Sequence, residues 1–194
     1  MRVMRAGLLT IVALCIGGCG INNIPTDDEA VKAAWGQVQN QYQRRADLVP
    51  NLVATVKGYA EHEQETLEAV TEARAKVAQM NVSADTINDP AAFKAFEQNQ
   101  NALTGALSRL MVVVEKYPDL KANQNFLQLQ SQLEGTENRI SVARRDYIAA
   151  VQKYNTEIRT FPGRIWHAIL YRDMQVRQSF EANEGAATAP VVKF

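Results

Sequence analysis

Apolar residues recur every three or four positions along most of this chain. One run extends from residue 31 to residue 77, a second from 93 to 114, and a third from 126 to 158. This spacing places the apolar side chains on one face of a helix, whereas a half-buried strand alternates at every second residue. The sequence therefore predicts long amphipathic helices, and no region shows the alternation or β-branched clustering of a sheet.

Short connections separate these runs. Asn81 to Pro90 follows the first run, Tyr117 to Leu120 ends the second, and Phe161-Pro162-Gly163 ends the third. Long helices with short joints pack as antiparallel neighbours. We predict an all-α fold, an antiparallel helical bundle of three long helices with a shorter fourth helix over Ile165 to Ala182. The bundle is expected to span residues 27–184, followed by an extended tail over 185–194.

Pro50 interrupts the first run, but the apolar spacing keeps its phase on both sides. A break followed by a new helix would have no reason to preserve that phase. We therefore predict one long helix that is kinked near Val49-Pro50. The alternative is a second helix that begins at Pro50, because proline suits the first position of a helix.

The N-terminus has the organisation of an export signal. Arg2 and Arg5 precede eleven apolar residues, Ala6 to Ile16, and small residues follow. As a helix the apolar stretch is about 16 Å long, against roughly 30 Å of bilayer hydrocarbon. Residues 1–18 are therefore predicted to be a signal peptide rather than a lasting membrane span.

Ile16-Gly17-Gly18-Cys19 resembles the bacterial lipobox, in which the cysteine receives the lipid. We predict lipidation of Cys19, a tether over residues 19–26, and attachment to the membrane through acyl chains. Cys15 would leave with the signal peptide. Gly20 rather than Asp after the cysteine favours the periplasmic face of the outer membrane in a diderm bacterium. An ordinary signal anchor and a cleaved soluble export are the alternatives.

The net charge of the chain indicates whether nucleic acid or anionic lipid is expected as a partner. Twenty-one basic and twenty-one acidic residues leave no net charge, and a chain that wraps nucleic acid normally has a basic excess. No nucleic-acid partner is expected. Loss of Arg2 and Arg5 with the signal peptide leaves an acidic excess of two, so composition predicts no electrostatic attraction to anionic lipid.

Several segments resemble the signatures of LemA proteins. They are 44–63 (RRADLVPNLVATVKGYAEHE), 117–126 (YPDLKANQNF), 136–140 (TENRI), 154–155 (YN), 161–162 (FP) and 190–194 (PVVKF). The resemblance covers residues 28–194 in the same order. It implies a membrane-tethered antiparallel helical bundle of the cell envelope without an established catalytic activity.

Residues with catalytic or metal-binding chemistry are sparse. His62 lies among Glu61, Glu63 and Glu65, but a zinc-hydrolase helix needs a second histidine at position 66, which is Thr. No glycine-rich phosphate loop or Gly-x-Ser-x-Gly elbow is present. We expect no enzyme, no cofactor and no metal. A metal- or small-ligand-binding bundle that uses His62 and its acids is the alternative function, and an enzyme with a site assembled from distant residues is a weaker one.

Seven polar residues of the segments 44–63 and 136–140 form the candidate site: Arg44, Arg45, Asp47, Asn51, Glu137, Asn138 and Arg139. Arg45 and Asn138 fall near the apolar stripes, where a polar group needs a partner. The set predicts either an interhelical polar network that fixes register or a face that binds a partner. The main hypothesis is a membrane-anchored, non-enzymatic envelope scaffold that binds another envelope protein through a helical surface.

Overall fold

The computed structural model describes residues 20–181, all of whose regular elements are helical. The predicted signal peptide, Cys19 and the tail over 185–194 lie outside the described residues. The elements are α2 (Asn23–Lys57), α3 (Gln64–Gln79), the 3₁₀ helix η1 (Ala84–Asn88), α4 (Pro90–Val114), α5 (Pro118–Lys121), α6 (Gln124–Glu157) and α7 (Gly163–Leu170). The predicted all-α helical bundle is confirmed. The tether is shorter than expected, because α2 already begins at Asn23 and buries Ile24.

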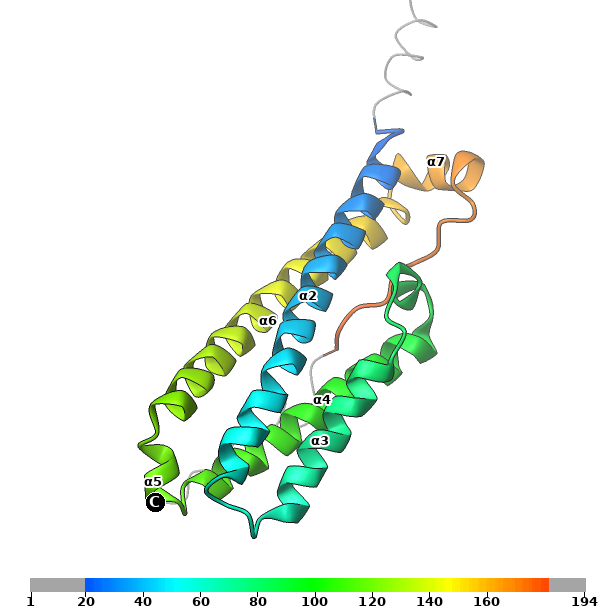
Figure 1. Ribbon diagram of the computed structural model, residues 1–194. Coiled ribbons are helices and arrows are strands. Elements are labelled where there is room, and N and C mark those ends of the chain that lie inside the picture. Colours follow the sequence, from blue (N-terminus) through cyan, green and yellow to red (C-terminus); the bar gives the residue numbers. More distant parts are fainter. Residues whose placement is uncertain (1–19, 182–194) are drawn as a thin grey trace, which may run out of the picture.

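Two antiparallel helix pairs make up the bundle (Figure 1). α2 packs along α6, α3 packs along α4, and α2 also contacts α3. Buried residues follow each other along α2 in steps of three and four from Val31 to Val56, so one stripe of this helix faces its neighbours over nearly its whole length.

The apolar side chains form two clusters, one toward each end of α2. The upper cluster contains Trp35 and Tyr42 of α2 with side chains of η1, α4 and α6. The lower cluster contains Val49 and Val56 of α2 with side chains of α3, α4 and α6. Tyr42 and Val49 therefore belong to different clusters, although they are only two turns of α2 apart.

α2 is continuous through Pro50, so the alternative of a new helix at that residue is wrong. The prediction of one helix up to Val77 is also wrong, because α2 ends at Lys57 and α3 begins at Gln64. The chain reverses over residues 58–63, and Ala60 within this turn is buried in the lower cluster. The apolar phase persists because both helices face that one cluster, and residues 20–181 form four long helices instead of three.

The predicted fourth helix over Ile165 to Ala182 is also corrected. α7 ends at Leu170, and residues 171–181 have no regular helix. We call residues 171–181 the strap. Beyond one local turn, in which Met174 N donates to the carbonyl of Tyr171, its backbone bonds to distant parts of the chain, as when Gln178 N donates to the carbonyl of Ile87 at 2.9 Å. Those tertiary hydrogen bonds satisfy backbone N–H and C=O groups that a helix would pair within itself.

An aromatic group anchors the strap in the upper cluster. Trp35 of α2 lies 5.0 Å from Phe96 and 5.3 Å from Tyr147, measured between ring centroids. Phe180 of the strap lies 5.0 Å from Phe93 and 5.5 Å from Tyr147. The Trp35 indole N–H donates to the carbonyl of Ser83 at 3.0 Å. α2, α4, α6 and the strap therefore share one set of stacked and edge-on rings.

Substitution of Pro50 tests the continuity of α2. Pro50 has no N–H to donate to the carbonyl of Ala46, and interior proline destabilises a helix by about 3 kcal/mol. We expect Pro50→Ala to raise the free energy of unfolding by about 1–3 kcal/mol in urea titration.

Pro90→Ala is the matched control. Pro90 is the first residue of α4, behind the Asp89 cap, where no helical bond is lost. We expect Pro90→Ala not to raise the free energy of unfolding. A loss of stability in Pro50→Ala would contradict an uninterrupted helix at this position.

Candidate functional site

The guanidinium of Arg45 is buried at the centre of the bundle, with 1% of the residue exposed. Nη1 donates to Thr104 Oγ1 at 2.8 Å and to Glu137 Oε1 at 3.0 Å. Nη2 donates to Gln100 Oε1 at 2.7 Å and to the Gln100 carbonyl at 3.2 Å. The guanidinium carbon also lies 5.0 Å from the centre of the Tyr42 ring. One side chain of α2 is thereby bonded to both α4 and α6.

This Arg45 network separates the two apolar clusters. Arg45 lies in α2 between Tyr42 of the upper cluster and Val49 of the lower one. A buried guanidinium is tolerated where acceptors satisfy its donors. Gln100, Thr104 and Glu137 present acceptors to Nη1 and Nη2, while Nε has no hydrogen-bond partner among the described residues. The network therefore fixes the register of α2, α4 and α6. Burial, the largest influence, raises the pKa of the neighbouring Tyr42 hydroxyl.

The structure brings only Arg45 and Glu137 of the candidate set into contact. The other five side chains are exposed: Arg44, Asp47 and Asn51 on α2, and Asn138 and Arg139 on α6. Among these, Asn138 was expected near an apolar stripe and faces solvent instead. Asp47 accepts a hydrogen bond from Gln43 Nε2 at 2.7 Å, and Arg139 Nη2 donates to Thr136 Oγ1 at 3.2 Å. Both are contacts within one helix.

A groove of about 600 Å³ adjoins this network between the C-terminal half of α4 and the N-terminal half of α6. Its apolar lining comes from Met111, Val114, Phe126 and Leu133, and its polar lining from Glu115, Lys121, Gln130, Glu134, Glu137 and Asn138. Three carboxylates and one ammonium group give the lining an acidic character. Lys121 Nζ is paired with Glu115 and Arg45 Nη1 with Glu137, so Glu134 carries the unbalanced negative charge of the lining.

The neighbourhood of His62 does not assemble a metal site. His62 lies in the turn between α2 and α3 and is exposed, as are Glu61 and Glu65. Glu63 accepts a hydrogen bond from the hydroxyl of Tyr117 at 3.2 Å. Between residues 20 and 181, no group of three or more His, Cys, Asp or Glu side chains is placed to hold a metal ion.

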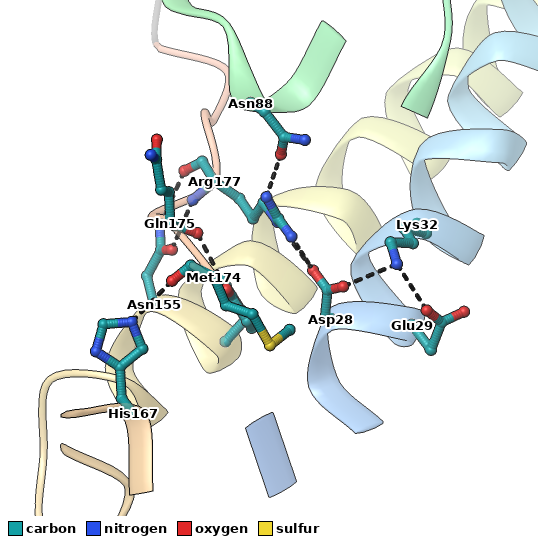
Figure 2. A network of polar contacts seen from close by, with 10 residues as sticks. Asp28, Glu29, Lys32, Asn88, Asn155, His167, Met174, Gln175 and Arg177 are labelled. Atoms are coloured by element: carbon teal, nitrogen blue, oxygen red, sulfur yellow. Dashed lines mark hydrogen bonds and ion pairs between the residues drawn. The ribbon is translucent and has the colours of Figure 1, made fainter. Parts of the chain in front are cut away.

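Sequence reasoning missed a second buried network, which Figure 2 shows around Arg177 of the strap. The Arg177 guanidinium donates to Asp28 Oδ1 of α2, with Nε at 2.9 Å, and to Asn88 Oδ1 of η1. The side chain of Asn155 bonds to both the N–H and the carbonyl of Arg177 at 3.0 Å. Lys32 Nζ approaches the second Asp28 oxygen at 2.9 Å. We call these contacts the Arg177 network.

The Arg177 network joins four segments of the chain. Arg177 and Asp28 are both buried, although 149 positions separate them. Tyrosine hydroxyls of α6 continue the attachment, since Tyr147 donates to the carbonyl of Gln178 and Tyr154 to that of Gln175. Burial raises the pKa of both tyrosines. No sequence pattern pairs residues so far apart in the chain. The one sequence feature that could have indicated burial of Arg177 is its position in a segment with apolar neighbours.

These features define an all-α bundle whose helices are held in register by buried arginine networks. The family model of the LemA family matches residues 34–194, and the chain belongs to this family.

Curated relatives agree with that assignment. The chain is 27% identical over 140 residues to Protein LemA of Metamycoplasma hominis, across 72% of this chain and 60% of that protein. It is 24% identical over 187 residues to Magnetosome protein MamQ 2 of Paramagnetospirillum magneticum, across 88% of this chain and 68% of that protein. The family and these relatives support a membrane-associated envelope protein. None of the helices within residues 20–181 is long and apolar enough to cross a membrane.

Removal of the buried guanidinium tests the structural role of the Arg45 network. Arg45→Ala leaves acceptors on Gln100 and Glu137 without their donor in a largely buried site. We expect a loss of about 2–4 kcal/mol in the free energy of unfolding. Glu137→Ala should cost about 1 kcal/mol, because its side chain is 41% exposed, and the double variant should show coupling of about 0.5–3 kcal/mol.

Arg44→Ala and Arg139→Ala serve as controls, because both side chains are exposed on the same two helices. Each should change stability by less than about 0.5 kcal/mol. Equal effects of Arg44→Ala and Arg45→Ala would contradict the role assigned to the buried network.

Proposed function

We propose that this LemA-family protein is a lipid-anchored, non-enzymatic scaffold of the bacterial envelope, which binds another envelope protein through a helical surface. The observation that carries the proposal is the groove between α4 and α6, with its apolar floor and acidic lining. The family match and the LemA and MamQ relatives support membrane association.

The length of α6 sets the distance between the groove and the proposed lipid anchor. α2 begins and α6 ends at the same end of the bundle (Figure 1). Gly20, the residue after Cys19, lies at this end, because its carbonyl accepts a hydrogen bond from Asn23 N at 3.0 Å. Gln130 of the groove is twenty-seven residues before Glu157, the last residue of α6. At 1.5 Å per residue the groove is about 40 Å from that end. A lipid on Cys19 would hold the groove away from the membrane, on the periplasmic face of the outer membrane in a diderm bacterium.

The lining of the groove defines the chemistry of the partner. Met111 and Leu133 offer apolar surface, and Glu134 carries negative charge beside it, because Glu137 is already paired with Arg45. An amphipathic helix with one apolar face and flanking Lys or Arg residues fits such a groove. The Arg45 network at its upper end keeps α4 and α6 at a fixed separation, which preorganises the surface.

Cross-linking in intact envelopes tests the proposal. We expect intact-mass analysis of the membrane-extracted protein to show acyl chains on Cys19, and cross-linking to recover one recurring envelope protein. Gln130→Arg places positive charge in the acidic groove and should reduce recovery of that protein at least tenfold, because it repels the basic residues of the partner.

Gln152→Arg is the matched control, since it makes the same change at an exposed position of α6 outside the groove. It should leave recovery unchanged. Failure to recover a recurring protein, or equal recovery with both variants, would contradict partner binding at the groove. An unmodified Cys19 would contradict the lipid anchor.

A further inference from the structure

α7 exposes an unusual amount of apolar surface for so short an element. The exposed fraction is 60% for Ile169, 45% for Ile165 and 51% for Leu170, and it reaches 82% for Phe161 just before the helix. Trp166, on another face of α7, packs against the upper cluster. Because residues four apart share a helix face, Ile165 and Ile169 form one outward apolar line.

Positive charge accompanies this apolar line. Arg159, Arg164 and Arg172 are exposed, and no acidic residue occurs between Ile158 and Arg172. Within residues 20–181, none of the three arginines forms an ion pair. The segment from Ile158 to Arg172 is therefore locally basic, with Glu157 and Asp173 at its two borders, although the predicted mature chain has an acidic excess.

α7 lies where the chain enters the bundle. Figure 1 shows it at the end of the α2–α6 pair, beside the first residues of α2. A Cβ atom on Gly20 would lie 3.7 Å from Cγ of Pro162, the residue before α7. Asn23 Nδ2 also donates to Glu157 Oε1 at 3.2 Å, which ties the start of α2 to the end of α6. Cys19 precedes Gly20 directly, so a lipid on it would bring the bilayer surface to α7.

We infer that α7 and Phe161 form a second contact with the membrane and lie on a bilayer surface that contains anionic lipid. Phe161, Ile165 and Ile169 would enter the boundary between headgroups and acyl chains, and the flanking arginines would meet lipid phosphates. Apolar burial combined with attraction to anionic lipid is the established basis of such interfacial helices. The inference rests on the proposed lipid anchor for the side of the bundle that faces the membrane.

Two membrane contacts, at Cys19 and at α7, would restrict the orientation of the bundle more than a single lipid anchor does. A single flexible attachment at Cys19 leaves the tilt of the bundle free, whereas α7 on the surface restricts it. Because the strap links α7 to α2, η1 and α6 through the Arg177 network, that restriction extends to the whole bundle. The groove between α4 and α6 would then keep a constant height and direction above the membrane.

A fluorescent label measures the depth of α7. The lipidated protein should carry no free thiol, so Ile169→Cys provides one labelling site at an exposed position. The labelled protein is reconstituted into vesicles of phosphatidylethanolamine and phosphatidylglycerol, with brominated acyl chains as quencher. We expect quenching at Ile169→Cys to exceed at least threefold that at Val112→Cys, a residue of α4 that is 67% exposed.

The outcomes distinguish a failure of the inferred α7 contact from a failure of the proposed lipid anchor. Protein that remains on the vesicles with equal, weak quenching at both labels would overturn the inference and leave the anchor standing. Protein that is absent from the vesicles and lacks an acyl mass would overturn the anchor. A label at Ile169→Cys that is shielded without lipid would indicate a second copy of the chain on this face and would also overturn the inference.

Discussion

A guanidinium group that leaves water needs oxygen acceptors on several sides, and this requirement decides how the two ends of the described chain meet. Arg177 finds them on Asp28 of α2 and Asn88 of η1, while its own backbone bonds to Asn155 of α6. The same strap inserts Phe180 into the rings around Trp35. Together with Trp166, which packs against the upper cluster, these contacts fix α7 beside the residues that follow the predicted anchor.

The two ends of the bundle hold different features. The first residues of α2, α7 and the Arg177 network lie at the upper end, and the groove between α4 and α6 lies at the lower end. The Arg45 network lies between the two apolar clusters and sets the register of three helices. In the proposed envelope scaffold, the two arginine networks would supply the rigidity that holds the groove at a fixed distance from the membrane.

Periodicity predicted the helices well because their burial repeats every three or four residues. It failed at residues 58–63, where Ala60 keeps the apolar phase inside a turn. It failed again over residues 171–181, where Met174 and Phe180 fit a helical spacing while the backbone bonds to Ile87 and to tyrosines of α6. Arg45 could be identified as buried from its place in the stripe of α2. The Arg177–Asp28 pair could not, because only the folded chain joins residues so far apart.

Amide hydrogen exchange at Gln178 tests the central claim, that buried arginine contacts hold the strap in the bundle. The Gln178 N–H donates to Ile87 in the fold, so its exchange reports whether the strap is in place. We predict protection comparable to that of core amides of α6, and at least tenfold faster exchange at Gln178 in Arg177→Ala while amides of α3 and α4 keep their rates. Exchange at Gln178 as fast as in an unstructured peptide in the unsubstituted protein would contradict the claim.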